Sequence, residues 1–349
     1  MCRAEQREDT MRTFLRPRPA AIIPAFVPRS DTSRFRARRA RHLSATVGIV
    51  IMATFALAPA ASATYAASNG LIAFQADTGS GYQIYTVKPN GHDLRQITHL
   101  DGDALHADWS PDGRRIAFAV QTVADCSNLA IMNADGSHLT IVAHGPSICE
   151  DEPSFTPDGS RLVFEQYDIA TDTDALWSMK IDGSGRHRII APPYGATDPN
   201  VSPDGRTISF VGFNGQDLGQ ALFTVHLDGT GRTRITPFET DVAIKQDWAP
   251  DGRHLVYTDN ADNFDLPANV VTVRPDGTGS HDVTHYQNPD LRAYVGSYSP
   301  DGQWIIFRVE DHGRYALYRA RPDGSDRHAI LPLSTLRPRG IDWGSAPED

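Results

Sequence analysis

The amino-acid sequence predicts an all-β protein, a six-bladed β-propeller with four antiparallel strands in each blade. Three observations support this fold class: a repeat of 44 to 50 residues, a turn motif present in five copies, and two incomplete units at the ends of the repeat array. An aromatic residue within each apolar run marks the repeat, at Phe74, Phe118, Phe164, Phe210, Tyr257 and Phe307. Four strand-sized pieces in each period of this length are typical of a propeller blade.

Each unit begins with a short strand, which ends at Trp109, Phe155, Val201, Trp248, Tyr298 or Trp343. A corner such as Ser-Pro-Asp-Gly at 110–113 then leads into a continuous apolar run such as 115–120. Third and fourth strands follow, for example at 222–226 and 233–236. Continuous apolar runs bounded by turn residues are typical of strands buried on both faces. Blades are covered on both faces by their neighbours, so this pattern favours a propeller.

A second turn recurs between the third and fourth strands. Its glycine follows Asn or Asp in all six units, at Gly91, Gly136, Gly183, Gly229, Gly277 and Gly324. A β-branched residue stands six positions after each glycine, at Ile97, Val142, Ile189, Ile235, Val283 and Ile330. This constant register predicts a tight hairpin in every blade.

The two ends of the array complement each other. Residues 69–74 lack a preceding short strand, and residues 341–345 lack following strands. We expect them to share one blade, which closes the ring and removes an exposed sheet edge. The predicted organisation is a signal peptide with a long basic leader at 1–63, a linker at 64–68, the propeller at 69–345 and a tail at 346–349.

The N-terminal region has the features of an export signal. Basic residues at 34–42 precede an apolar run at 43–63, which ends in Ala61-Ser62-Ala63 and fits an A-x-A cleavage site. An uncleaved membrane anchor is the alternative, because the run is about long enough to span a bilayer. We therefore expect a periplasmic, secreted or cell-wall-associated protein, with no membrane span once the signal is cleaved.

Charge is distributed unevenly along the chain. Residues 1–63 carry 11 Lys and Arg against 4 Asp and Glu, whereas the remainder carries 22 against 39. An acidic body without a basic stripe argues against nucleic-acid binding, which needs clustered cations. We expect a monomer whose partner is a protein or peptide, or a cell-envelope glycan.

The repeated corner is predicted to be structural. Its aspartates (Asp112, Asp158, Asp204, Asp251 and Asp301) occur five times in a turn composition where Asp bonds its own backbone. Both tight turns of each blade lie at one end of the propeller. The longer, varied connections, such as 168–174 and 259–267, lie at the other end. Binding residues concentrate in variable loops on a rigid scaffold, so we expect the site on that loop-bearing face.

Residues three before each strand end should approach the central channel: His106, Glu152, Asp198, Lys245, Val295 and Gly340. Arg292, Tyr294 and Arg339 lie nearby in the sequence. The functional interpretation is a polar ring around the channel mouth that binds a peptide, a glycan or a metal ion, and the alternative is ordinary solvated loop polarity. We expect no cofactor; a divalent metal bound by His106, Glu152 and Asp198 is the alternative, because mixed nitrogen and oxygen ligands suit several metals.

Cys126 and Cys149 are the cysteines that remain after signal cleavage. Both fall on the loop-bearing side of the same unit. Disulfides persist in exported proteins, so we expect these two residues to be bonded.

The "DWSPDG" strand–turn–strand at 108–113 and the following Asp-Gly hairpin resemble the TolB-type (PD40, or WD40-like) propeller repeats. This resemblance covers about residues 69–345. Members include the periplasmic protein TolB and the propeller domains of prolyl-oligopeptidase-like and tricorn-type proteases. The resemblance implies the fold, but one scaffold hosts many activities.

Two departures from that family bear on function. TolB has an α/β domain before its propeller, and the peptidase relatives carry a G-x-S-x-G hydrolase motif; neither feature is found in this sequence. We therefore expect a non-catalytic, exported propeller that binds a partner through its loop-bearing face. The alternative is a propeller enzyme, such as a metal-dependent sugar lyase or lactonase, with its site at the channel mouth.

Overall fold

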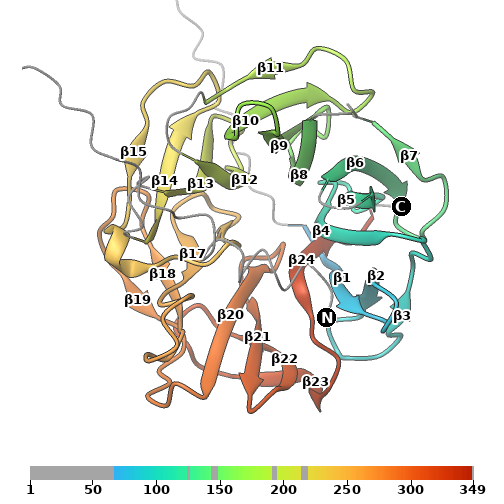
Figure 1. Cartoon of the computed structure of the whole chain (residues 1–349). Coiled ribbons are helices and arrows are strands. Elements are labelled where there is room, and N and C mark those ends of the chain that lie inside the picture. Colours follow the sequence, from blue (N-terminus) through green and yellow to red (C-terminus); the bar gives the residue numbers. More distant parts are fainter. Residues whose placement is uncertain (1–66, 124–125, 143–147, 191–194, 214–218, 348–349) are drawn as a thin grey trace, which may run out of the picture. The chain divides into compact units, whose positions relative to one another are not determined.

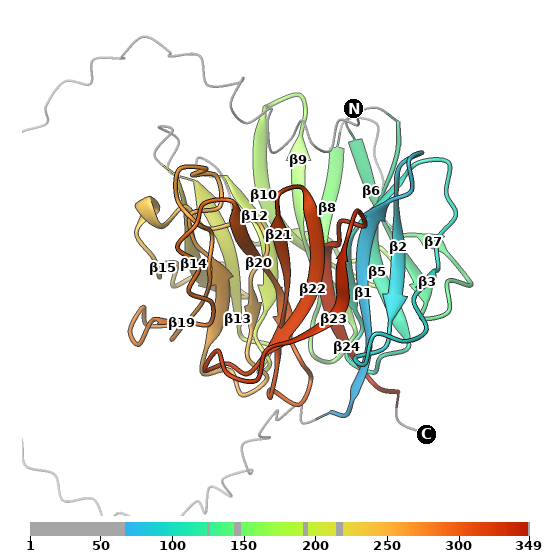
Figure 2. The same cartoon turned by 90° about the horizontal axis from the view of Figure 1, so that it is seen from below.

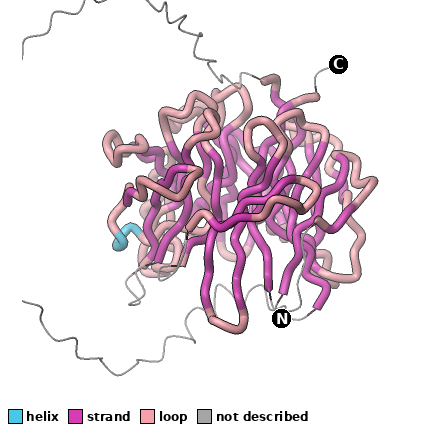
Figure 3. The backbone as a smooth tube through the Cα atoms, turned by 90° about the horizontal axis from the view of Figure 1, so that it is seen from above, coloured by secondary structure: helices cyan, strands magenta, loops and turns pink. Residues whose placement is uncertain are grey.

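The computed structural model describes residues 67–123, 126–142, 148–190, 195–213 and 219–347. These residues form six four-stranded antiparallel sheets arranged around one axis, as a six-bladed propeller (Figure 1). The fold class predicted from the repeats is therefore confirmed. The helical structure in the described part is the 3-10 turn η1 (Phe238–Thr240), shown in cyan in Figure 3. None of it approaches the length and apolarity of a membrane-spanning helix.

The blades follow the chain in order. Blade 1 contains β24 (Arg339–Ser345), β1 (Asn69–Asp77), β2 (Tyr82–Val87) and β3 (Arg95–Gln96). Blade 2 contains β4 (Asp103–Trp109), β5 (Arg115–Val123), β6 (Cys126–Asn133) and β7 (Thr140–Ile141), and blade 3 contains β8 (Ile148–Phe155), β9 (Arg161–Asp168), β10 (Thr173–Lys180) and β11 (His187–Arg188).

Blade 4 contains β12 (Ala196–Val201), β13 (Thr207–Phe213), β14 (Gln220–His226) and β15 (Thr233–Arg234). Blade 5 contains β16 (Asp247–Trp248), β17 (Leu255–Thr258), β18 (Val270–Val273) and β19 (His281–Asp282). Blade 6 contains β20 (Leu291–Tyr298), β21 (Ile305–Asp311), β22 (Arg314–Ala320) and β23 (His328–Ser334). The core lies between blades, where the repeated aromatics at 74, 118, 164, 210 and 307 are fully buried.

The ring closes as the incomplete end units predict. β24 pairs antiparallel with β1, so blade 1 combines both ends of the array (Figure 2). Ala346 N–H donates to the Ser68 carbonyl at 2.7 Å, and the Asn69 amide donates to Asp301 of blade 6 at 2.9 Å. The predicted signal peptide at 1–63 lies outside the described residues.

The corner motif stabilises its own turn by hydrogen bonds and packs against the corner of the adjacent blade. Asp112 Oδ1 accepts hydrogen bonds from the Ser110 hydroxyl (2.6 Å) and from Arg114 N–H (3.1 Å), and the other four copies also receive a backbone N–H two residues on. The corners also stack from blade to blade. A Cβ on Gly159 would lie 3.7 Å from Pro111, and one on Gly205 would lie 3.7 Å from Pro157. The structural interpretation of these aspartates therefore holds.

The second glycine series also makes an inter-blade contact. Each glycine has positive φ and approaches the carbonyl of the β-branched residue in the preceding blade, so that an added Cβ would lie within 3 Å of that oxygen. The six pairs are Gly136 with Ile97, Gly183 with Val142, Gly229 with Ile189, Gly277 with Ile235, Gly324 with Val283 and Gly91 with Ile330. This contact explains why a glycine recurs at this turn in every blade.

A ring of hydrogen bonds joins the inner strands near their hairpin ends. The side chain just before each strand end bonds to the backbone of the next blade. In three blades the side chain is an aspartate that accepts a backbone N–H: Asp342 from Trp109 (2.9 Å), Asp108 from Phe155 (2.8 Å) and Asp247 from Tyr298 (2.8 Å). In two blades a serine hydroxyl oxygen accepts it: Ser154 from Val201 (3.4 Å) and Ser297 from Trp343 (2.8 Å). In the remaining blade the Asn200 amide donates to the Gln246 carbonyl (3.0 Å). At the hairpin end, each inner strand is thus hydrogen-bonded to the inner strand of the next blade.

Candidate functional site

The predicted inward positions coincide with irregularities of the inner strands. The pairing register shifts between Leu105 and Asp108, and the same shift occurs between 151 and 154, 197 and 200, and 295 and 298. The φ angle is positive at His106 (51°), Glu152 (50°), Asp198 (47°), Lys245 (145°) and Gly340 (50°). The positions of His106, Glu152 and Asp198 are β-bulges, which turn a side chain out of the regular alternation of a strand, whereas Lys245 lies in the connection just before β16.

His106 of blade 2 contacts Asp151 of blade 3. The distance from His106 Nδ1 to Asp151 Oδ1 is 2.7 Å, and the same oxygen accepts the Glu152 N–H at 2.8 Å. The Ser127 hydroxyl donates to the other oxygen of Asp151 at 3.2 Å. Burial disfavours protonation of His106, but the charge and hydrogen bond of Asp151 outweigh it and raise the histidine pKa.

Glu152 and Glu165 of blade 3 meet at the hydroxyl of Thr197 in blade 4. Thr197 Oγ1 contacts Glu152 Oε2 and lies 2.5 Å from Glu165 Oε2. Glu152 Oε2 also accepts Asp198 N–H at 2.5 Å. All three side chains are buried. Burial, followed by the charges of Asp198 and Asp151, raises the pKa of Glu152 to about 7.

Asp198 and Lys245 continue this series into blades 4 and 5. Asp198 Oδ2 accepts Gln246 N–H at 2.9 Å. Burial raises the pKa of Asp198, although the charge of Lys245 opposes the rise. Burial disfavours a charged Lys245, but Asp342 and Asp198, followed by Asp247 and Asp108, raise its pKa well above the usual value. The charges of carboxyl groups from blades 1, 2, 4 and 5 therefore favour the ammonium form of Lys245.

We call His106, Asp151, Glu152, Glu165 and Asp198 the acidic arc. It spans blades 2 to 4 on the loop-face half of the inner strands. Glu152 and Asp198 are 7% exposed, whereas the His106 side chain is 33% exposed. His106 is thus the most accessible member, and the carboxyl groups lie behind it.

Three arginines gather on the opposite side of the axis, where blade 6 meets blade 1. Figure 1 shows blade 3 and blade 6 on opposite sides of the ring. Arg308 Nη1 donates to the Pro338 carbonyl at 3.2 Å, between Arg337 and Arg339 in sequence. Burial, followed by the positive charges of Arg339 and Arg337, lowers the pKa of Arg308 to about 10. We call Arg308, Arg337 and Arg339 the arginine cluster.

Arg292, which the sequence places near the site, acts as a clasp for the loop at 260–266. Its two Nη atoms donate to the carbonyls of residues 260, 261, 263 and 266 at 2.7 to 3.1 Å, and Nε donates to the Tyr294 hydroxyl at 2.8 Å. All five donors of this guanidinium are engaged within the protein. Arg292 and Tyr294 therefore position a loop of the face.

The three residues considered as metal ligands are spread along the acidic arc, each bonded to protein groups: His106 to Asp151, Glu152 to Thr197, and Asp198 to Gln246. Within the described ranges, no three His, Cys, Asp or Glu side chains are grouped in a way that could hold a metal ion. On the same face, Cys126 and Cys149 form a disulfide that joins β6 to β8, with their Cα atoms 4.9 Å apart.

Comparison with known proteins finds a family that these repeats resemble. Residues 51–198 match the family model of the TolB beta propeller domain. The repeats in this part of the chain are similar to TolB-type propeller repeats. A 36-residue segment is 56% identical to the Tol-Pal system protein TolB of Nitratidesulfovibrio vulgaris, covering 10% of this chain and 8% of that protein.

Solved structures agree on the fold. TolB from Acinetobacter baumannii superposes with a TM-score of 0.65 at 17% identity, over 79% of this chain and 66% of that chain. An oligogalacturonate lyase in complex with manganese gives a TM-score of 0.53 at 17% identity, over 77% of this chain and 75% of that chain. Both a TolB and an enzyme thus share the fold of this propeller, so the fold alone does not assign an activity.

Sequence reasoning missed the partners supplied by the second strands of the propeller. The residue after each repeated second-strand aromatic faces the next blade. Gln75 Oε1 accepts His106 N–H (2.6 Å), Thr258 Oγ1 accepts Val295 N–H (2.8 Å), and Glu165 and Arg308 occupy the same register. A signal was present, because a polar residue interrupts an apolar run at each of these four positions.

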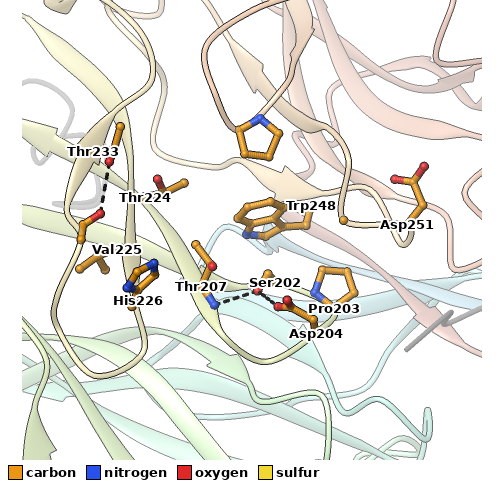
Figure 4. A pocket seen from close by; sticks show the side chains of 13 residues that line it. Ser202, Pro203, Asp204, Thr207, Thr224, Val225, His226, Thr233, Trp248 and Asp251 are labelled. Carbon is orange, nitrogen blue, oxygen red and sulfur yellow. Dashed lines mark hydrogen bonds between the residues drawn. The ribbon is translucent and has the colours of Figure 1, made fainter. Parts of the chain in front are cut away.

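A separate hollow lies on the hairpin face between blades 4 and 5, with a volume of ≈ 390 Å³ (Figure 4). Its origin is one small residue. Thr207 stands five positions after the start of the corner, where other blades carry Arg115, Arg161, His254 or Trp304. Arg115, for example, lies over the Phe155 ring of the next blade at 5.9 Å. The corner groups that line the hollow bond one another, as Ser202 does with Asp204 and Thr207 N–H.

Proposed function

We propose that this TolB-type propeller is an exported scaffold that binds a protein or peptide partner through its loop-bearing face. The observation that carries the proposal is the acidic arc. Side chains from three neighbouring blades lie at one bulge register and are bonded from blade to blade. Such a rigid, pre-positioned charged surface binds a partner without a large cost in ordering.

The loops around this face also present apolar side chains. Phe264 is 63% exposed, Ile169 49%, Leu266 44% and Ile244 38%, and all four lie in connections at the loop end of the blades. Aromatic and apolar anchors next to charged groups are typical of protein interfaces. They favour a protein partner over a glycan as the principal ligand.

The test compares matched variants in a capture experiment from the native cell envelope. Phe264→Ser removes an exposed anchor from the loop face, and Arg253→Ala removes an exposed side chain from the hairpin face. We expect a partner that the wild-type and the Arg253→Ala protein retain and that Phe264→Ser loses. Purified partner should then bind Phe264→Ser roughly tenfold or more weakly, as for an interface anchor. Equal binding by all three proteins would refute the proposal.

One observation favours an enzyme as the second candidate. Glu152, with its pKa raised to about 7, lies next to Asp151 of the His106–Asp151 pair, and a carboxylic acid with a raised pKa is suited to general acid catalysis. Metal analysis of purified protein, with assays for elimination or hydrolysis of acidic sugars and lactones, distinguishes this candidate. Activity that is lost in Glu152→Gln would support it.

A further inference from the structure

The arginine cluster is unusual because it concentrates positive charge inside an acidic protein. Arg308 is 5% exposed, and its Nε atom is fully buried without a hydrogen-bond partner in the described part of the structure. Glu310 lies 3.8 Å from Arg308 Nη2 and 3.7 Å from Arg337 Nη2, so one carboxylate serves two guanidinium groups. Burying like charges together is costly unless an anion compensates them.

Aromatic rings lie beside these guanidinium groups. Arg308 lies over the Tyr294 ring at 4.3 Å, and Arg337 lies over the Tyr315 ring at 5.1 Å. The edge of a guanidinium carries paired N–H groups, which match the two oxygens of a carboxylate.

The two outer arginines are accessible from the loop face. The Arg337 side chain is 22% exposed, and Arg339 is partly exposed at the start of β24, where it pairs with Gln75 of β1. Gln75 in turn accepts His106 N–H. The arginine cluster is therefore linked through one residue to the acidic arc on the other side of the axis.

We propose that Arg308, Arg337 and Arg339 form a binding site for a carboxylate on the ligand of this face. Arg337 and Arg339 contact the carboxylate, and Arg308 supports them from behind as a buried positive charge. If the ligand also carries a positive group at its opposite end, that group would contact the acidic arc. This inference rests on the proposed function for the location of the ligand, but it concerns a different set of residues.

Two sources could supply the carboxylate, namely a peptide and a uronic acid. The probes are acetyl-glycyl-glycine with a free C-terminus, the same peptide as its C-terminal amide, glucuronate, and glucose. Binding is followed in ¹⁵N–¹H spectra through the Nε–H signals of the three arginines, and by calorimetry. We expect the two carboxylates to bind and to shift these signals, and we expect the amide and glucose to leave them unchanged.

Substitutions then assign the site. Arg337→Gln with Arg339→Gln should weaken carboxylate binding about tenfold or more, since charge-assisted hydrogen bonds are lost. Arg253→Gln, an exposed arginine on the hairpin face, is the matched control and should bind as wild type. Arg337→Lys with Arg339→Lys keeps the charge but loses the paired N–H edge, so its binding should be intermediate.

Three outcomes would overturn the assignment. They are carboxylate binding that is equal in wild type and in the double glutamine variant, signals that do not respond to any carboxylate, and inorganic phosphate that binds more tightly than every carboxylate. The Phe264→Ser capture experiment does not depend on these arginines. Failure of the carboxylate site and failure of the partner-binding proposal are therefore distinguishable.

Discussion

Glu152 and Glu165 meet at a single hydroxyl group, that of Thr197. A hydroxyl carries one hydrogen and can donate it to only one of the two carboxyl groups. Burial and the charges of Asp198 and Asp151 raise the pKa of Glu152 to about 7, so below this pH Glu152 carries a proton at the junction of blades 3 and 4.

This proton links stability to pH. The pKa of Glu152 is raised to about 7, so between the ordinary value of about 4.3 and this value the folded state binds more protons than the unfolded state. The free energy of unfolding should fall as the pH rises through this window. Glu152→Gln removes the titration and should gain stability relative to wild type at pH 8 but not at pH 4. Urea unfolding at several pH values measures this, with the exposed Glu239→Gln as control; parallel curves for wild type and Glu152→Gln would contradict it.

Lys245 should stabilise the charged forms of the buried carboxyl groups near it. Its charge lowers the pKa values of Asp108, Asp198 and Asp247, which burial raises. Lys245→Met would leave these carboxylates without a compensating cation. We expect a loss of about 3 kcal/mol in unfolding free energy at pH 8 and a smaller loss at pH 5, where the carboxyl groups are more readily protonated. A loss that is the same at both pH values would refute this account.

The inter-blade glycine contact can be separated from simple backbone strain. Gly183 and Gly79 both have positive φ, but a Cβ on Gly183 would collide with the Val142 carbonyl, whereas a Cβ on Gly79 meets nothing within 4 Å. Gly79→Ala should cost about 1 kcal/mol. Gly183→Ala should cost clearly more, because two blades must move apart. Denaturant midpoints measured side by side test this, and equal losses would rule out the contact.

Ring closure depends on the C-terminal strand. Deletion of residues 340–349 removes nearly all of β24 and exposes β1 as an unpaired edge. We expect a large fall in melting temperature and aggregation on heating. An unchanged melting temperature in the truncated protein would contradict the closure.

The disulfide is expected to matter for stability. Cys126 and Cys149 enclose a loop with a sequence separation of 23 residues, and closing a loop of this size stabilises the folded state by about 3 kcal/mol in the chain-entropy account. The double Cys126→Ser, Cys149→Ser variant should unfold at lower denaturant concentration than oxidised wild type. Mass spectrometry under non-reducing conditions provides the direct check, and free thiols in the exported protein would refute the bond.

Much of the architecture could be predicted because the turn chemistry repeats. The corner motif fixes the register of every unit, and counting back three residues from each strand end leads to His106, Glu152 and Asp198, which lie at β-bulges. The same counting could not show that Glu152 and Asp198 are buried and bonded to other blades. Their partners depend on how the bulges turn side chains between strands, which no local pattern encodes.

Arg292 illustrates the same limit. The sequence predicts Arg292 near the channel mouth, but its role depends on the path of the loop at 260–266, whose carbonyls it binds. Arg308 was not singled out, because it sits within an apolar second strand. The cluster forms only in the folded protein, where Arg337 and Arg339, about 30 positions later in the chain, lie near Arg308.

The bond between Ser68 and Ala346 has a practical consequence for engineering. It places the two ends of the propeller side by side in blade 1. A short linker between them, with new termini opened in one of the loop-face connections, would yield a circular permutant. Every blade would then be formed by one continuous segment, except the blade that contains the new termini. The choice of loop would decide which blade is closed by the two chain ends.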